Sequence, residues 1–167
     1  LPKLGLSDWE YEMCEAIYES ASPAAELLAE RDALPYRHCP DVPDYFAELS
    51  EDKAKKGRVL VPKEARPSMS DGGRVAIRTL TAAAKRDGVQ IRTGERVVKV
   101  ILNGAGEAIG VEVETEEGAR QRVKARKAVI FATGGFTHDP ELRRNFLNAP
   151  VYGGCAALTN EGDFIRI

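Results

Sequence analysis

Near the amino-terminus, apolar residues recur at the spacing of an amphipathic helix. Trp9, Met13 and Ile17 stand four residues apart, so their side chains fall on one helical face. Ser7 and Glu10 match the S-x-x-E capping box that begins a helix. The pattern predicts a helix from about residue 8 whose aromatic and methionine stripe packs into the core.

The next segment changes from helical to extended signals. Ser22-Pro23 places a serine at an N-cap and a proline at a first helical position, which predicts a second helix start. Prolines throughout residues 34–43 exclude a helix there. Val59-Leu60-Val61 predicts a short strand. His38 lies alone in the proline-rich stretch, where a structural or solvated role is favoured over a catalytic or ligand role.

A clearly delimited helix is expected directly after Ser70-Asp71-Gly72-Gly73. Lys85 and Arg86 fall in its last turn, where basic side chains interact favourably with the helix dipole. Gly88 can adopt the left-handed conformation of a C-terminal cap. One face carries Ala76, Leu80, Ala83 and Ala84, and the small residues on it would let this helix lie close against a sheet.

From residue 89 onward the period becomes two, which is typical of strands. Apolar residues alternate or cluster over the segments 89–91, 97–102 and 109–113. Asn103-Gly104 and Glu116-Glu117-Gly118 separate the later runs and carry hairpin chemistry. We therefore expect a three-stranded antiparallel meander that closes with a strand around residues 120–125.

Residues 128–132, Ala-Val-Ile-Phe-Ala, are continuously apolar, which is typical of a parallel central strand buried on both faces. The run ends in Thr133-Gly134-Gly135-Phe136, and Asp139-Pro140 then predicts a helix start. Ligands of α/β proteins bind beyond the carboxyl ends of strands, where glycines let the backbone approach a nucleotide. This turn is therefore a candidate cofactor edge, although many α/β proteins have such a turn without a ligand.

Two other patterns imitate phosphate sites. Gly104, Gly106 and Gly110 resemble a dinucleotide fingerprint, but the residues that follow alternate as a strand, and the fingerprint requires a helix. Basic residues alternate between Arg120 and Lys127, where a solvated edge that discourages strand pairing is favoured over phosphate binding.

Composition narrows the class of protein. Of the 167 residues, 43% are hydrophobic and 30% charged, and the formal net charge is −2, which fits a globular domain and does not favour nucleic acid. No apolar run reaches the ~18 residues that suggest a membrane span, and no signal-peptide pattern opens the chain. Cys14, Cys39 and Cys155 form no C-x-x-C pair, which argues against a cysteine zinc or dithiol motif and indicates a reducing, cytoplasmic compartment.

Four motifs in order give the chain a family resemblance: GGRVAIRTLTAAAKRDGVQIRTGERV, VVKVILNGAGEAIGVEVET, ARKAVIFATGGFTHDPEL and TNEGDF. From Gly72 to Ile167 the sequence resembles the FAD-binding domain of the fumarate reductase, succinate dehydrogenase and ketosteroid dehydrogenase flavoprotein superfamily. Residues 1–71 match only loosely, mainly in the helices and the GRVLVP segment. The resemblance implies an N-terminal helical and loop segment over 1–71 and part of the FAD-binding domain over 72–167.

The implied fold is α/β, a partial FAD/NAD(P)-binding-type fold with parallel sheet strands, an antiparallel β-meander and packed helices that bind extended FAD. Val97 would contact the adenine region through its backbone. The other cofactor-binding residues that the resemblance implies lie in the turn after the apolar run and in the loop before the last helix: Ala132, Thr133, Gly134, Gly135, Asn160, Gly162 and Asp163.

The chain also departs from the family pattern. Phe164 stands where the family's GDG motif has its second glycine, and a bulky residue there could crowd the flavin. The family's G-x-G-x-x-G phosphate-binding segment and its substrate-capping domain do not occur in this sequence. We therefore expect an internal fragment that lacks FAD by itself, contains no assignable catalytic residue and self-associates through surfaces that the parent protein covers.

The resemblance implies a parent oxidoreductase that exchanges a hydride with a carbon next to a carbonyl or carboxylate of a small molecule. A dicarboxylate would need arginine clamps and a steroid would need an apolar slot with tyrosine donors, and the sequence alone locates neither set. One alternative is an isolated α+β binding or interaction module without catalytic activity. Another is a different flavoprotein, such as an aspartate oxidase or a disulfide-reductase-like enzyme, although the absence of C-x-x-C speaks against the dithiol type.

Overall fold

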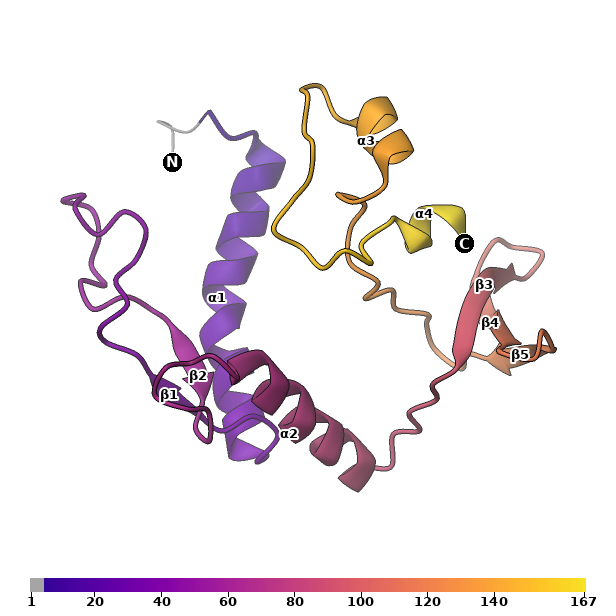
Figure 1. The fold of residues 1–167 in the computed structure, drawn as a ribbon, viewed down its shortest axis with the longest axis horizontal. Helices are drawn as coiled ribbons and strands as arrows, with labels where there is room; N and C mark the ends of the chain where they lie inside the picture. Colours follow the sequence, from indigo (N-terminus) through magenta and orange to yellow (C-terminus); the bar gives the residue numbers. More distant parts are fainter. Residues whose placement is uncertain (1–4) are drawn as a thin grey trace. The chain divides into compact units, whose positions relative to one another are not determined.

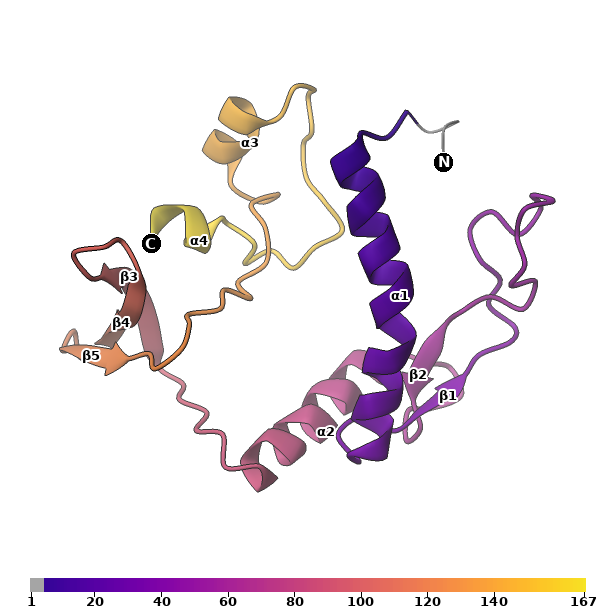
Figure 2. The same ribbon diagram turned by 180° about the vertical axis from the view of Figure 1, so that it is seen from behind.

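The computed structural model describes residues 5–167, which form two compact units that divide between Ile91 and Arg92. Figure 1 shows the helices and strands of each unit in chain order, and Figure 2 shows the same elements from behind. None of the helices in the described residues is long and apolar enough to cross a membrane. The family resemblance implies a different division, between residues 71 and 72, and this division stays a prediction.

The first unit begins with helix α1 (Asp8–Glu30). Its predicted capping box is confirmed: the Ser7 backbone N–H donates to Glu10 Oε2 at 2.8 Å, and the Glu10 N–H donates to Ser7 Oγ at 3.4 Å. The predicted second start at Ser22-Pro23 is wrong, because α1 continues through Pro23. A proline removes one backbone hydrogen bond from a helix, but Ser22 Oγ donates to Glu26 Oε1 within the helix instead of capping a new one.

The apolar stripe of α1 does not enter a core. The helix contains no buried residue, and the side chains of Trp9 and Ile17 are 68% and 63% exposed. The prediction of a core-facing stripe is therefore wrong for the described chain. A helical period identifies an apolar face, but the described residues do not supply a surface that covers it.

A two-stranded antiparallel sheet follows α1, with β1 (Tyr36–His38) paired to β2 (Leu60–Pro62). The short strand predicted at residues 59–61 is confirmed within one residue. His38 has a structural role, because its Nε2 lies 3.0 Å from the carbonyl oxygen of Gly57 and joins the long β1–β2 connection to the strand.

Helix α2 (Gly72–Arg86) completes the first unit. Its buried residues are Val75 and Ala83. Of the predicted packing face, therefore, only Ala83 is buried. The predicted C-terminal cap is confirmed: Gly88 has a φ of +79°, and the Val89 N–H donates to the carbonyl of Ala84 at 2.9 Å.

The second unit contains the predicted antiparallel meander, in the order β3-β4-β5. Its strands are β3 (Glu95–Leu102), β4 (Ala108–Thr115) and β5 (Arg120–Lys124). The glycine pattern near Gly104 is a hairpin loop that leads into β4, as expected. The basic side chain of Arg120 on β5 pairs with carboxylates on β4, Glu112 at 3.1 Å and Glu114 at 3.2 Å.

The predicted parallel strand at residues 128–132 is not formed, and neither is the expected strand at 89–91. Ile130, the centre of the apolar run, is 88% exposed. A strand is stabilised by hydrogen bonds to a neighbouring strand, and the described residues place no such neighbour beside either segment. The sheets of the described chain are therefore antiparallel only, within a mixed helix and sheet fold.

Two short helices end the second unit. The start predicted at Asp139-Pro140 is confirmed by α3 (Pro140–Phe146), whose N-cap is Asp139. The last helix is α4 (Asp163–Arg166), which follows Gly162 in the left-handed conformation. Phe136 packs edge-on against Phe146 with ring centroids 6.2 Å apart and fixes α3 to the preceding turn.

Candidate functional site

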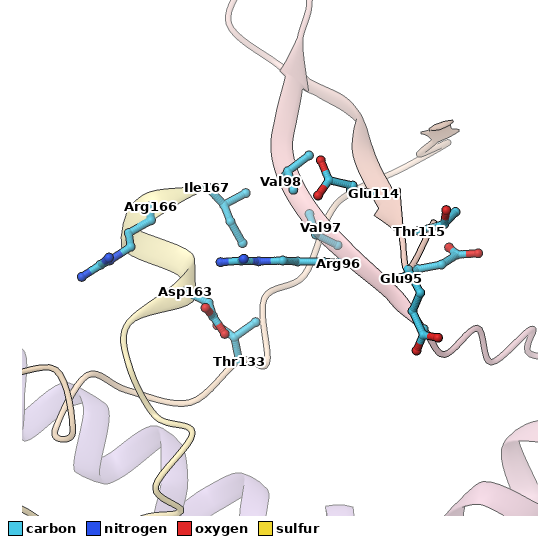
Figure 3. Close-up of a pocket in the computed structure, with 12 residues that line it drawn as sticks. Glu95, Arg96, Val97, Val98, Glu114, Thr115, Thr133, Asp163, Arg166 and Ile167 are labelled. Atoms are coloured by element: carbon cyan, nitrogen blue, oxygen red, sulfur yellow. The ribbon is translucent and has the colours of Figure 1, made fainter. Parts of the chain in front are cut away.

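A cavity of about 800 Å³ opens in the second unit among β3, the end of β4, Thr133 and α4. Figure 3 shows its lining side chains, with Arg96 extending from β3 toward α4. Pockets of roughly 300–1,000 Å³ are typical of small-molecule and cofactor sites. The cavity lies at the segments that the sequence singles out, the meander and the glycine turn.

The structure brings together residues from three of the predicted segments. Val97, Thr133 and Asp163 all line the cavity, although they lie far apart in the sequence. Ala132, Gly134, Gly135, Asn160 and Gly162 do not line it; they lie in the two segments that carry Thr133 and Asp163.

Backbone hydrogen bonds hold those two segments to each other. The Gly162 N–H donates to the carbonyl oxygen of Gly135 at 3.0 Å, and the His138 N–H donates to that of Asn160 at 3.1 Å. We call this arrangement of residues 133–138 and 160–163 the turn–loop junction. It places Thr133 and Asp163 at one side of the cavity.

Glycine is required at two positions of the turn–loop junction. Gly134 has a φ of +76°, and an added Cβ would lie 2.6 Å from Asn160 Oδ1. Gly162 has a φ of +80°, and its Cβ would overlap the side chain of Leu142. Gly135 differs, because an added Cβ would meet nothing within 4 Å, so its backbone is open to a ligand.

Asp139 connects the junction to both short helices. Its Oδ1 accepts from the backbone N–H groups of Glu141 and Leu142 at 2.8 Å each, and its carboxylate forms an ion pair with Arg166. These bonds, first the one from Leu142, hold the pKa of Asp139 below its usual value against the opposing effect of burial. Sequence reasoning identified Asp139 only as a helix cap and missed Arg166, since no local pattern indicates an ion pair 27 residues apart.

Carboxylates dominate the charge around the cavity. Four carboxylates, Glu95, Glu114, Glu116 and Asp163, line it together with Arg96 and Arg166. Glu95, Glu114 and Arg166 are already in ion pairs. Carboxylates accept hydrogen bonds from sugar hydroxyls and repel phosphates. The site therefore fits the hydroxyl-bearing and base portions of a dinucleotide, whereas a pyrophosphate would need donors from outside this cavity.

A second cavity, of about 850 Å³, lies in the first unit between α1 and the β1–β2 connection. Its walls are rich in aromatic and apolar side chains, among them Tyr18, Tyr45, Phe46 and Leu49. The guanidinium of Arg58 also lines it and is committed to Asp44, with Nη2 2.7 Å from Oδ2. We call it the aromatic cavity.

The FAD binding domain family matches residues 5–167 of the chain. The 4-oxocyclohexanecarboxylate 2-dehydrogenase of Sinomonas cyclohexanicum is 35% identical over 96 residues, 57% of this chain and 17% of that protein. The 3-oxosteroid 1-dehydrogenase of Comamonas testosteroni is 31% identical over 53% of this chain and 15% of its own length. The probable fumarate reductase Ifc3 of Shewanella frigidimarina is 31% identical over 55% of this chain and 16% of its own length. The chain thus matches about one sixth of the length of these relatives.

A solved structure supports the same fold. The 3-ketosteroid-Δ4-(5α)-dehydrogenase of Rhodococcus jostii RHA1, in complex with 4-androstene-3,17-dione, matches with a TM-score of 0.55 at 22% sequence identity. The match covers 75% of this chain and 26% of that protein.

Proposed function

This chain belongs to the FAD-binding-domain family, and from that premise we propose that it forms part of the FAD site of an oxidoreductase. The parent enzyme exchanges a hydride with a substrate carbon next to a carbonyl or carboxylate. The observation that carries this proposal is the turn–loop junction, which brings Thr133 and Asp163 to one cavity with Val97.

In the proposed site each residue has a distinct part. Val97 lies at the cavity on β3, an edge strand of the meander, which we assign to the edge of a base, and the Gly135 backbone is open to close approach. Asp163 and the Thr133 hydroxyl offer partners for ribose or ribityl hydroxyls. FAD, when bound, supplies the hydride chemistry, while the protein holds and orients it.

Titration of the purified chain with FAD tests this site. We expect backbone amide resonances of Val97, Thr133 and Asp163 to shift saturably, because these residues line one cavity. We also expect desalting to remove the flavin, since most charged groups that line the cavity are carboxylates, which repel a pyrophosphate. FMN, which lacks the adenosine, is the control and should leave Val97 unshifted. Absence of any saturable shift with FAD would contradict the proposal.

For the substrate we propose a cyclic ketone over a dicarboxylate. The aromatic cavity offers apolar walls with tyrosine hydroxyls, and Tyr45 at its rim is 99% exposed. Its Arg58 is already paired with Asp44 and is poorly available as a carboxylate clamp. Two of the three relatives described above are named for ring-ketone substrates, which supports the same class.

Ligand titrations followed by tyrosine and phenylalanine resonances test the substrate class. We expect cyclohexanone or androstenedione, which carry no carboxylate, to shift Tyr45 and Phe46, and fumarate to leave both unchanged, because the cavity wall is aromatic. Tyr45→Ala should weaken binding of the ketone by about tenfold, the loss of one aromatic contact and one hydroxyl partner. Tyr36→Ala is the matched control, since Tyr36 does not line this cavity. Stronger shifts with fumarate than with the ketones would contradict the proposal.

We also propose a reducing, cytoplasmic location, which is supported by the three cysteines, all free, with Cys14 and Cys155 exposed. Self-association of the chain stays a prediction. The exposed side chains of Trp9, Ile17 and Ile130 support it, and light scattering across a concentration series measures it directly.

A further inference from the structure

The ion pair between Asp139 and Arg166 links the start of α3 to the end of α4. The two oxygens of the Asp139 carboxylate have separate partners. Oδ1 accepts from the Glu141 and Leu142 N–H groups, and Oδ2 pairs with Arg166 Nη2. Asp139 is buried, at 7% exposure, while the Arg166 side chain remains about half exposed at the cavity.

Polar contacts at two points join helix α4 to the rest of the second unit. The Gly162 N–H donates to the carbonyl oxygen of Gly135 at the start of the helix, and Arg166 pairs with Asp139 one turn later. None of the residues Asp163–Arg166 is buried, and Gly162 provides no side-chain cap. These two contacts are therefore the polar anchors of α4.

The position of α4 determines part of the cavity wall. Asp163 at its start and Arg166 at its end both line the cavity, as Figure 3 shows. If Arg166 were released, the hydrogen bond from Gly162 to Gly135 alone would hold the start of α4. That bond would then open more often, and Asp163 would lose its fixed direction. The charge of Asp139 thus acts on the site from outside its lining, through Arg166.

We propose that Asp139 is a positioning residue of the cofactor site: through Arg166 it holds α4 against the turn–loop junction and fixes how Asp163 faces the cavity. This inference rests on the proposed function of that cavity. It assigns the buried carboxylate a second role besides capping α3, and it makes Arg166 an anchor whose charge is already neutralised before a ligand enters.

Asp139→Asn separates the two roles. An asparagine amide oxygen can still accept from the Glu141 and Leu142 N–H groups, so the α3 cap is kept, but the charge that holds Arg166 is lost. Amide hydrogen exchange at Gly162 reports the anchoring of α4, and exchange at Leu142 reports the cap. We expect protection at Gly162 to fall about three- to tenfold, because a charge-assisted hydrogen bond is lost. Protection at Leu142 should stay nearly unchanged. Glu141→Gln, which removes a neighbouring carboxylate that has no ion pair among the described residues, should change neither.

A double-mutant cycle tests whether Arg166 carries the effect. Arg166→Met should lower protection at Gly162 as Asp139→Asn does, and the double variant should be no worse than either, because both changes break one contact. Arg166→Lys should restore part of the protection. Full additivity of the two single changes, or unchanged protection at Gly162 in Asp139→Asn, overturns the proposed link.

FAD titrations of the same variants test the positioning role. We expect the FAD dissociation constant of Asp139→Asn to rise by about the factor lost in exchange protection, with Glu141→Gln equal to wild type. Equal FAD affinity in Asp139→Asn and wild type, alongside reduced protection at Gly162, overturns positioning while leaving the proposed function intact. If wild type itself fails to bind FAD, both the proposed function and the positioning role are refuted. The double-mutant cycle by hydrogen exchange then still shows whether the ion pair holds α4.

Discussion

Replacing Gly134 by alanine should abolish FAD binding and destabilise the second unit by at least about 2 kcal/mol. Two effects add at this position. The φ of +76° is in the left-handed region, which costs an alanine roughly 1–2 kcal/mol. The new Cβ would also lie 2.6 Å from Asn160 Oδ1 and 2.9 Å from its Nδ2, so the Asn160 side chain must move. Urea unfolding and FAD titration measure the two consequences.

The effect should reach the site through Asn160, because the three heavy atoms nearest to the added Cβ all belong to its side-chain amide. The Asn160 backbone is held by the hydrogen bond from the His138 N–H, so the side chain must turn about its own bonds. Asn160 is one of the residues that the family resemblance assigns to the cofactor, and its displaced amide changes the turn–loop junction that carries Thr133 and Asp163. Loss of stability and loss of ligand should appear together.

Two other glycines of the second unit provide matched controls for Gly134→Ala. Gly135→Ala adds the same atom where nothing lies within 4 Å and φ is not positive, so stability should be unchanged. Gly118→Ala has a φ of +80° and open space around it, so it should show the backbone cost alone. If Gly134→Ala were no more destabilising than Gly118→Ala, the overlap with Asn160 would be relieved locally and the expected loss of the site would not follow.

The features that sequence reasoning predicted correctly are those that local residues determine. The capping box at Ser7, the cap at Asp139 and the left-handed Gly88 each depend on residues within a few positions. The meander was predictable for the same reason, because alternation specifies strands and short turn motifs join neighbours. Its order β3-β4-β5 follows from hairpin connections alone.

The failed predictions concern what packs against a segment. The apolar run at residues 128–132 has the composition of a central strand, but pairing requires neighbouring strands that the described residues do not place there. The stripe at Trp9 likewise indicates an apolar face without providing its cover. At Pro23 the local start signal did not decide the structure: α1 continues through the proline, even though an interior proline removes one hydrogen bond and crowds the preceding turn.

The candidate site was predictable only through the family resemblance. Spacing alone indicates that Thr133–Gly135 forms a turn after an apolar run, and nothing local connects it to Asp163. The structure makes that connection through the bond from Gly162 to Gly135. No signal in the sequence predicted the Asp139–Arg166 pair, since nothing in the residues around Arg166 indicates which carboxylate it pairs with.

In the first unit, the largest effect is expected from Gly57→Ala, which should unfold the β1–β2 connection and remove the aromatic cavity. An added Cβ would overlap the carbonyl oxygen of Val42 and lie 3.0 Å from the Val42 carbonyl carbon and 3.1 Å from that of Pro43. All three atoms belong to the backbone, so no side-chain rotation can relieve the overlap. The φ of +69° adds the left-handed cost.

Gly57 is also a hydrogen-bonding centre of that connection. Its N–H donates to the carbonyl of Ala54 at 2.6 Å, and its own carbonyl accepts from His38 Nε2 at 3.0 Å. A backbone shift at Gly57 breaks both bonds and moves Arg58, which lines the aromatic cavity and pairs with Asp44. We expect a loss of about 3 kcal/mol or more, since overpacking against rigid backbone adds to the conformational cost.

Thermal unfolding followed by circular dichroism measures this loss, with Gly88→Ala as the matched control in the same unit. Gly88 has a φ of +79° and nothing within 4 Å of an added Cβ, so its substitution isolates the backbone cost of roughly 1–2 kcal/mol. The difference between the two variants is then the overlap with Val42 and the lost bonds. Ketone binding should disappear in Gly57→Ala and persist in Gly88→Ala, because only the former distorts the wall that carries Tyr45 and Arg58. Equal destabilisation by both substitutions would show that the connection yields at Val42, and would contradict a rigid aromatic cavity.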